Sequence, residues 1–191
     1  SVFQKYRKLS LMMDNDFISI NIAVVTISDT RELKNDKSGD TLVNRITRFG
    51  HKVTLREIVK DDFDKISDLF VKLLESKNID VIISTGGTGL TGKDITPEVM
   101  NTIFEKTIDG FGEMFRWISY KKINTSALQS RALAGVASGK YIFCLPGSPS
   151  ACKDGWDKIL RYQLDIRHKP CNFVEIMPRL QEHKFSRFKN Q

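Results

Sequence analysis

Residues 79–98 (IDVIISTGGTGLTGKDITPE) contain the side chains whose types and spacing are most suited to chemistry. The first part of this segment, through Ser84, predicts a buried strand, and the residues from Thr96 onward predict the start of a helix. Four glycines and Asp94 lie between them. A glycine loop at the end of a strand presents backbone N–H groups to a ligand, and an acid there can bind a metal ion. This combination predicts a site for a phosphate-bearing ligand.

Two known motifs nearly match this loop. Residues 87–92 satisfy the G-x-G-x-x-G spacing of dinucleotide-binding folds, and residues 87–93 satisfy G-x-x-x-x-G-K, the front of a P-loop. A P-loop continues with Ser or Thr, whereas Asp94 stands here, and both motifs need a helix that begins inside the glycine run. We expect Thr96 to be the N-cap and Pro97 the first helical residue, so both interpretations are disfavoured. A purely structural loop does not explain why glycines and an acid crowd the carboxyl end of a strand, where ligands bind in open α/β sheets.

Three further loops are expected to reach the same edge of the sheet, at residues 28–39, 60–62 and 145–150. Taken singly, each has a local explanation as a tight turn or as a helix cap. In particular, Asp61 or Asp62 can cap the helix that follows them. No single loop therefore indicates a ligand site, and the four loops must be considered together.

Together, the four loops suit a phosphorylated ligand. The helix starts at Thr96 and Ser148 offer N–H donors and positive dipole ends to phosphates. The acids Asp61 and Asp94 repel an anion unless a cation lies between, and Mg²⁺ held by one or two carboxylates plus phosphate oxygens resolves that conflict. The residues thus predict a Mg²⁺–nucleotide or another phosphorylated ligand. The sequence offers no convincing Ser-His-Asp or Cys-His set, which disfavours covalent catalysis.

Strand-like and helix-like segments alternate along the chain and must position these loops. This order predicts one α/β domain in which a parallel sheet carries helices on both faces. The strand ends at Ser28, Thr85 and Pro146 should then lie along one edge. Residues 128–137 are rich in small side chains and match neither pattern. Strands are expected at 20–27, 53–59, 81–84 and 141–145, and helices at 38–49, 63–74, from 97 onward, 109–122 and 149–164.

Composition limits the class of protein. The chain has 191 residues, of which 40% are hydrophobic and 28% charged, and this suits one globular domain with a substantial core. No apolar run approaches the ~20 residues of a membrane span, so no membrane partner is expected. The formal net charge of +7 suits an anionic small molecule, and without a DNA- or RNA-binding signature no nucleic-acid partner is expected. We expect an N-terminal tail at 1–18, the domain at 19–177 and a basic C-terminal tail at 178–191.

Cysteines and histidines lack the spacing of disulfide or metal frameworks. Cys144, Cys152 and Cys171 contain no C-x-x-C pair, which indicates free thiols in a reducing, cytoplasmic setting. A zinc site is disfavoured. The histidines are far apart in the sequence and are expected at the surface: His51, His168 and His183.

Several short motifs are recognisable along the chain. They are Ile-Ser-Asp (27–29), Asp-Lys-Ser-Gly (36–39), Thr-Gly-Gly-Thr-Gly (85–89), Asp-Ile-Thr-Pro-Glu (94–98), Gly-Phe-Gly-Glu (110–113), Ser-Arg-Ala (130–132) and Leu-Pro-Gly-Ser-Pro (145–149). Together they resemble the MoaB/MogA family of molybdenum-cofactor biosynthesis proteins. Residues 125–132 and 167–173 resemble the MoaB type most. The resemblance extends from about residue 20 to about residue 173, and the combination is specific although no single motif is.

The resemblance implies a molybdopterin-binding α/β fold, a single three-layer domain with a mostly parallel sheet, that assembles as a homotrimer or homohexamer. Active members use Mg²⁺ and ATP to adenylylate molybdopterin before molybdate is inserted, which implies handover to a molybdate-inserting enzyme. The substrate's own phosphate is the nucleophile, so the protein must align two phosphates and neutralise their charge. The leading hypothesis is therefore a molybdopterin adenylyltransferase.

The resemblance also assigns site residues, position by position. Asp61 and Asp94 match acids linked to Mg²⁺ and catalysis, although Asp62 lies beside Asp61. The loop at the nucleotide is matched by Gly86, Gly87, Thr88 and Gly89. The positions that match a pocket for pterin or nucleotide are Ser28, Asp29, Asp36, Ser38, Gly39, Ser130, Pro146, Gly147 and Ser148.

Two other functions stand as alternatives. A non-catalytic member of the family would bind molybdopterin without transferring AMP, and a nicotinamide-dependent oxidoreductase rests only on the G-x-G-x-x-G match. Assembly depends on the aromatic residues of segment 109–122. Phe111, Phe115 and Trp117 either bury against a neighbouring subunit or complete the core of the monomer.

Overall fold

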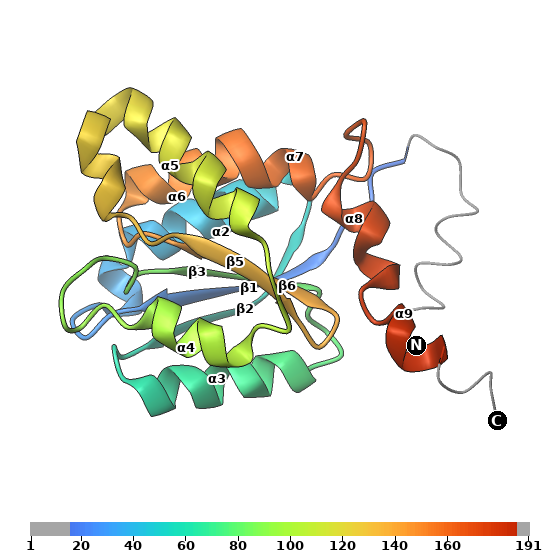
Figure 1. The fold of residues 1–191 in the computed structure, drawn as a ribbon, viewed down its shortest axis with the longest axis horizontal. Coiled ribbons are helices and arrows are strands. Elements are labelled where there is room, and N and C mark those ends of the chain that lie inside the picture. The colour runs from blue at the N-terminus through green and yellow to red at the C-terminus, as the bar shows by residue number, and fades with distance from the viewer. Residues whose placement is uncertain (1–15, 187–191) are drawn as a thin grey trace.

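A six-stranded sheet forms the middle layer of the structure (Figure 1). The structure is a computed structural model that describes residues 16–186. In the spatial order β2-β1-β3-β6-β5-β4, the first four strands are parallel, and β5 and β4 are antiparallel to their neighbours. The sheet is thus mostly parallel, as predicted. Its strands are β1 (Asn21–Ile27), β2 (Lys52–Val59), β3 (Val81–Thr85), β4 (Lys106–Thr107), β5 (Leu133–Ala137) and β6 (Lys140–Leu145).

Helices cover both faces of the sheet and complete the predicted three layers. On one face lie α2 (Lys37–Phe49), α5 (Asp109–Ile123) and α6 (Pro149–Gly155), and on the other lie α3 (Phe63–Glu75) and α4 (Thr96–Ile103) (Figure 1). A π-helical turn (Trp156–Leu160) and α7 (Arg161–Gln163) continue from α6. The remaining short helices are η1 (Leu33–Asn35), η2 (Asn124–Gln129), α8 (Phe173–Ile176), η4 (Met177–Arg179) and α9 (Glu182–Ser186). No helix within residues 16–186 is long and apolar enough to cross a membrane.

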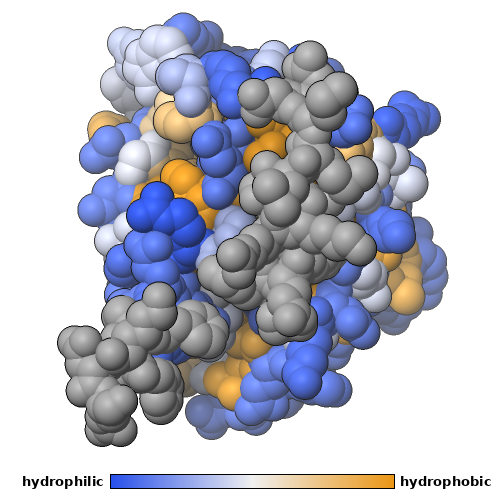
Figure 2. Space-filling model, turned by 90° about the vertical axis from the view of Figure 1, so that its right-hand side faces the viewer, coloured by the Kyte–Doolittle hydropathy of each residue, from blue (hydrophilic) through white to orange (hydrophobic). Residues whose placement is uncertain are grey.

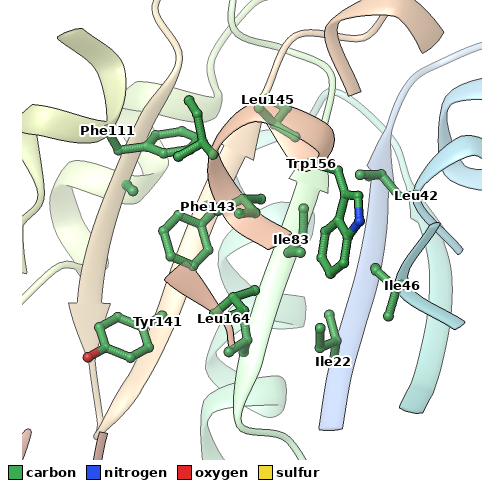
Figure 3. Close-up of a cluster of buried hydrophobic side chains, with 14 of the residues drawn as sticks. Ile22, Leu42, Ile46, Ile83, Phe111, Tyr141, Phe143, Leu145, Trp156 and Leu164 are labelled. Atoms are coloured by element: carbon green, nitrogen blue, oxygen red, sulfur yellow. The ribbon is translucent and has the colours of Figure 1, made fainter. Parts of the chain in front are cut away.

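Each face of the sheet buries a separate hydrophobic core, because successive residues of a strand point to opposite faces. In β1, Ile22 and Val24 join the core beneath α2 and α5, whereas Ala23 and Val25 join the core that contacts α3 and α4. Burying each large aliphatic side chain contributes about 1.5–3 kcal/mol, so the two cores hold the sheet rigidly in place. Figure 3 shows the first core, with Ile22, Leu42, Ile46, Ile83, Phe111, Tyr141, Phe143, Leu145, Trp156 and Leu164 labelled.

The four parallel strands end together at one edge of the sheet. Thr85 at the end of β3 is in register with Thr26 of β1 and Leu145 of β6, and Ile27 of β1 is in register with Val59 of β2. The chain passes from β1 to β2 on one side and then crosses to β3 on the other. The carboxyl ends of β1 and β3 therefore flank a topological switch point, where open α/β sheets bind ligands.

The segment at 128–137 resolves into the end of η2 and strand β5. Its small residues have a packing reason, because the ring of Phe104 lies against the backbone of Gly135 and leaves no room for a Cβ atom there. The strand pairs antiparallel with β6 through a tight connection at Ser138 and Gly139. A short, Gly- and Ala-rich strand carries little hydrophobic periodicity, which explains why its type could not be predicted.

Two sequence interpretations need correction or refinement. Phe111 and Phe115 are only 4% and 2% exposed and complete the core of the monomer, whereas Trp117 on the same helix is 60% exposed. The expected surface position of His51 is wrong, since this residue is 3% exposed. It lies between Gly50, the C-cap of α2, and the start of β2, and its Nδ1 accepts a hydrogen bond from the backbone N–H of Ile20 (3.3 Å).

The described parts of both expected tails contact the domain. At the N-terminal side, the ring of Phe17 lies 4.9 Å from that of His51, centroid to centroid. At the C-terminal side, Leu180 packs against the first core, and Lys184 Nζ lies 3.5 Å from Glu105 Oε1. The end of the molecule that carries α8 and α9 is mainly hydrophilic on its coloured surface (Figure 2). Residues 1–15 and 187–191 lie outside the described residues.

Candidate functional site

A cavity of about 440 Å³ opens at the carboxyl ends of the parallel strands. Four loops form its wall, one after each of β1, β2, β3 and β6, and Gln129 and Ser130 at the end of η2 close one side. The sequence-predicted residues on this wall are Ser28, Asp61, Gly86, Gly87, Thr88, Gly89, Asp94, Ser130, Pro146, Gly147 and Ser148. Loops that are far apart in the sequence thus meet where the strand ends predicted they would.

The glycine loop after β3 needs glycine at its first two positions. Gly86 and Gly87 have positive φ angles of 111° and 65°, which side-chain-bearing residues rarely adopt. A Cβ atom on Gly86 would collide with the carbonyl oxygen of Ile27, and one on Gly87 would collide with the hydroxyl of Thr96. The loop therefore lies directly against β1 and the start of α4, with its backbone facing the cavity.

Thr96 does not serve as the predicted N-cap. Helix α4 begins at Thr96, with Ile95 in the cap position and no side-chain cap. The Thr96 hydroxyl instead donates to the carbonyl of Gly86 (3.0 Å), and its backbone N–H donates to the carbonyl of Gly87 (3.0 Å). The hydroxyl binds the loop and does not cap the helix, because the carbonyls of the tightly folded loop need hydrogen-bond donors. Thr96 thus ties the first turn of the helix to the first turn of the loop.

Asp94 is held at the far end of the loop by short local hydrogen bonds. Its Oδ2 accepts from the backbone N–H of Thr91 (2.9 Å) and from the hydroxyl of Thr91 (2.7 Å). Partial burial acts to raise the pKa of Asp94, but the hydrogen bonds from Thr91 and the amide of Gly89 outweigh it and lower the pKa. The carboxylate of Asp94 is therefore ionised and fixed in orientation.

Asp61 and Asp29 connect the loops after β2 and β1. The backbone N–H of Asp29 donates to Oδ2 of Asp61 (3.0 Å), and the backbone N–H of Asp61 donates to Oδ1 of Asp29 (3.3 Å). Burial and the neighbouring charge of Asp29, with a further contribution from Asp94, raise the pKa of Asp61. Asp61 is thus a partly buried carboxylate with other negative charges close by.

Two basic residues on the cavity wall were not among the predicted site residues. Lys93 Nζ pairs with Asp29 Oδ2 at 2.6 Å. This contact is the main reason why the pKa of Asp29 is lowered, although Asp29 itself does not line this cavity. Arg31 donates to the carbonyl of Gly147 (2.9 Å) and to the hydroxyl of Ser38. The two positive side chains offset the acids around the cavity.

Asp36, Ser38 and Gly39 lie behind the cavity wall, since none of them lines the cavity. Asp36 is fully buried and caps α2, where one carboxylate oxygen accepts from the backbone N–H of Gly39 (2.9 Å). Its other oxygen accepts from the Thr26 hydroxyl (2.7 Å). Burial acts to raise the pKa of Asp36, but these hydrogen bonds, and one from Arg56, lower it. This group supports the start of α2 and, through Ser38, the side chain of Arg31.

The loop after β6 forms the opposite wall. The hydroxyl of Ser148 accepts from the backbone N–H of Ala151 (3.1 Å) and caps α6, as the sequence predicts. The Thr85 hydroxyl donates to the carbonyl of Pro146 (2.9 Å), so the loops after β3 and β6 are directly joined. A Cβ atom on Gly147 would lie 3.4 Å from Cα of Gly86, which shows how closely the two backbones approach.

Further lining residues were missed by sequence reasoning. Thr26 and Ile27 are the last two residues of β1, Thr85 ends β3, and Gln129 ends η2. Arg31 and Lys93 could have been recognised as site residues from the sequence, because each lies within a loop that the sequence already predicts at this edge. Among residues 16–186, no group of three or more His, Cys, Asp or Glu side chains could hold a metal ion. A metal at this site would therefore depend on ligand oxygens as well as on protein carboxylates.

The fold and the cavity define an α/β protein whose ligand site lies at the carboxyl edge of a mostly parallel sheet, with a glycine loop, two acids and two bases around it. Comparison with known proteins identifies the family within this class of α/β proteins. A family described as probable molybdopterin binding domain matches residues 23–166. The chain belongs to this family, the MoaB/MogA molybdopterin-binding family.

Individual relatives support this membership. The chain is 42% identical over 161 residues to molybdenum cofactor biosynthesis protein B of Escherichia coli (strain K12), covering 84% of this chain and 95% of that protein. A crystal structure of molybdenum cofactor biosynthesis protein B aligns with a TM-score of 0.74 and 36% identity, over 92% of this chain and 100% of that chain. The molybdopterin biosynthesis enzyme MoaB from Thermus thermophilus aligns with a TM-score of 0.66 and 26% identity, over 74% and 89% of the two chains.

Proposed function

We propose that this protein acts in molybdenum cofactor biosynthesis as a molybdopterin adenylyltransferase. It would transfer AMP from ATP to molybdopterin in the presence of Mg²⁺, giving adenylyl-molybdopterin and pyrophosphate. The observation that carries the proposal is that two carboxylates, Asp61 and Asp94, share one cavity wall with a glycine loop and with the basic side chains of Arg31 and Lys93. This is the set of groups that two phosphate-bearing substrates require.

The proposed reaction needs alignment more than proton removal. A phosphate oxygen of molybdopterin attacks the α-phosphorus of ATP, a new P–O bond forms, and the bond from that phosphorus to the α,β-bridging oxygen breaks. Pyrophosphate leaves with the electron pair of that bond. The attacking oxygen is already ionised near neutral pH, so no strong general base is needed. The absence of an evident Ser-His-Asp or Cys-His set in the sequence is consistent with this chemistry.

The environment of Asp61 suits a divalent cation. This carboxylate is partly buried, and the charges of Asp29 and Asp94 oppose its ionisation, so a cation would relieve the repulsion. Asp61 and Asp94 would hold Mg²⁺ together with phosphate oxygens and water, which is how Mg²⁺ usually binds in nucleotide sites. Mg²⁺ would supply charge neutralisation on the phosphates.

The basic residues have separate proposed tasks. Lys93 is 77% exposed at its side chain and is held by an exposed ion pair with Asp29, so it can turn to an incoming phosphate at little cost. Arg31 is bound to Gly147, Ser38 and Asp36, so its positive charge is more restrained than that of Lys93. The glycine loop adds backbone N–H donors beside them.

The test is an adenylylation assay with molybdopterin, ATP and Mg²⁺. We expect adenylyl-molybdopterin and pyrophosphate in equal amounts, and we expect Asp94→Asn to lower turnover by about 100-fold while molybdopterin affinity changes by less than about 3-fold. The same assay without Mg²⁺ is the control. Binding of both substrates without transfer by the unmodified protein would refute the proposal.

A non-catalytic molybdopterin-binding protein is the second candidate. The observation that favours it is that both acids already have protein partners, since Asp94 accepts from the hydroxyl of Thr91 and Asp61 accepts from the backbone N–H of Asp29. Calorimetry separates the two functions. A binding protein would bind molybdopterin equally well with and without Mg²⁺–ATP and would release no pyrophosphate.

We also propose that the protein assembles as a homotrimer or homohexamer, and that it hands its product to a molybdate-inserting enzyme. The feature that supports assembly is an exposed apolar stripe on α5. Its residues recur every three positions and are each at least half exposed: Met114, Trp117, Tyr120 and Ile123. A second copy of the chain would bury this stripe. Sedimentation should give a mass of three or six chains, and Trp117→Asp should lower it. A monomer mass for the unmodified protein would contradict the assembly.

A further inference from the structure

Arg131 lies outside the cavity wall, yet it binds the glycine loop at several points. It belongs to the Ser-Arg-Ala motif that precedes β5. Its backbone N–H donates to the carbonyl of Thr88 (2.9 Å), its Nε to the carbonyl of Gly89 (2.7 Å) and its Nη2 to the carbonyl of Asp94 (2.5 Å). One residue thus holds the beginning and the end of the loop that contains Asp94.

Each of the three nitrogens of the Arg131 guanidinium binds a group of the protein. Nε and Nη2 bind loop carbonyls, and Nη1 pairs with Glu98 in the first turn of α4. Its side chain is 29% exposed, and it does not line the cavity, unlike Arg31 and Lys93. Because Arg131 binds the loop and α4 and does not line the cavity, its role differs from that of the two basic residues on the wall.

The orientation of one peptide group links Arg131 to the carboxylate of Asp94. In a trans peptide the C=O and the N–H point in opposite directions. The Thr88 carbonyl points to the backbone of Arg131, and the N–H of the same peptide group belongs to Gly89, whose amide interacts with the Asp94 carboxylate. The backbone N–H of Arg131 therefore holds the peptide group whose N–H interacts with Asp94. The guanidinium fixes the next carbonyl and that of Asp94 itself.

We propose that Arg131 is a positioning residue: it clamps residues 88–94 so that the Asp94 carboxylate and the loop amides are already aligned for a Mg²⁺–nucleotide. This inference rests on the proposed function for its catalytic consequence, while the clamp itself is independent of that function. Arg131 touches neither substrate in this scheme. Two of its three bonds to loop carbonyls come from its planar, multivalent guanidinium, which a lysine cannot reproduce, whereas the bond from its backbone N–H to Thr88 persists in both variants.

The test compares Arg131→Met and Arg131→Lys with the control Glu98→Gln. The control removes the ion pair outside the loop and leaves the three loop carbonyls bound. Hydrogen exchange on residues 88–94 is the readout that needs no turnover, and the buried strands β1 and β3 serve as the internal reference. Steady-state kinetics and molybdopterin affinity are measured on the same proteins.

We expect Arg131→Met to speed exchange of the loop amides by at least about 10-fold, with the strands unchanged, and to lower kcat by about 10- to 100-fold with molybdopterin affinity kept. Arg131→Lys should restore little, and Glu98→Gln should resemble the unmodified protein. Unchanged loop exchange, uniformly faster exchange in loop and strands, or full rescue by lysine would each overturn the clamp. If the unmodified protein transfers no AMP, the proposed function fails while hydrogen exchange still decides the role of Arg131.

Discussion

Asp61 and Asp62 are neighbours in the sequence, but their carboxylates serve different structures. Asp61 lines the cavity, and its Oδ2 accepts from the backbone N–H of Asp29 (3.0 Å). Asp62 turns away and caps α3, where its Oδ1 accepts from the backbone N–H of Lys65 (3.0 Å). Sequence alone left either acid as the candidate, and the geometry favours Asp61 for Mg²⁺ because, of the two, only Asp61 lines the cavity.

The different positions of Asp61 and Asp62 predict that one variant affects turnover and the other affects stability. Asp61→Asn should lower Mg²⁺-dependent turnover by about 100-fold and leave the thermal midpoint nearly unchanged, because its hydrogen bonds can persist. Asp62→Ala should leave turnover nearly unchanged and lower the free energy of unfolding by about 1 kcal/mol, since a helix loses its N-cap. Kinetics and denaturant unfolding measure the two effects. The assignment is wrong if Asp62→Ala is the variant that loses turnover.

The raised pKa of Asp61 predicts how Mg²⁺ affinity depends on pH. Burial and the charge of Asp29 raise this pKa above the ordinary value of 3.8, so Asp61 gains a proton at a higher pH than a free carboxyl does. Mg²⁺ needs the ionised form. Its affinity should therefore fall as the pH is lowered through the raised pKa, in the window above 3.8.

Titration of Mg²⁺ into the ATP complex, from about pH 7 down to about pH 4, measures this dependence. Asp61→Asn should make the dependence shallower and leave only the part that comes from protonation of the ATP phosphates. Asp94 is the internal comparison, because its pKa is lowered and it stays ionised throughout that window. A Mg²⁺ affinity that is flat with pH in the unmodified protein would argue against a role for Asp61 in metal binding.

Two glycines of the same loop provide a second matched pair. A Cβ atom on Gly89 would lie 2.7 Å from Oδ2 of Asp94, whereas one on Gly92 would meet nothing within 4 Å. Gly89→Ala should therefore displace the carboxylate and lower turnover by at least about 10-fold, while Gly92→Ala should have little effect. Both variants should keep molybdopterin affinity within about 3-fold. Equal activity of the two variants would show that the position of Asp94 does not limit the reaction.

Hydrophobic periodicity was sufficient to predict the layers of the fold. The apolar run of β1 and the helical pattern of α3 are both clear in the sequence, and the helix starts at Asp62 and Ser148 carry cap residues. Because parallel strands end at a common edge, the same pattern also predicted which loops meet. The antiparallel β5 escaped prediction, because its small residues suit close contact with Phe104 and carry no periodicity.

The candidate site was only partly predictable for a different reason. Glycines and acids in a loop indicate backbone ligands and a cation, but hydrogen bonds between distant segments leave no local pattern. The contact of Arg131 with Gly89 spans 42 residues, and that of Arg31 with Gly147 spans 116. The hydroxyl of Thr96 shows the same limit, since a tertiary contact with Gly86 displaced the cap that its position suggested.

The buried, neutral ring of His51 leads us to expect that the protein loses stability in mild acid. Its ring is buried against Phe17, Phe49 and Trp156, and its Nδ1 accepts from the backbone of Ile20. Burial lowers its pKa from 6.5 to about 4, with Asp165 acting in the opposite direction. The folded state therefore keeps the ring neutral, whereas the unfolded chain takes up a proton below pH 6.5. The stabilisation is complete above that pH and is lost progressively as the pH falls toward about 4.

The lowered pKa of His51 corresponds to about 3 kcal/mol of unfolding free energy over this window. Denaturant unfolding at a series of pH values measures it. His51→Asn is the matched variant, because its side-chain oxygen can accept from the N–H of Ile20 without titrating in this range. It should be less stable than the unmodified protein near neutral pH, owing to lost ring packing, but its stability should fall less steeply with acid. Parallel pH curves for the two proteins would mean that other groups cause the acid sensitivity and that His51 is protonated without unfolding.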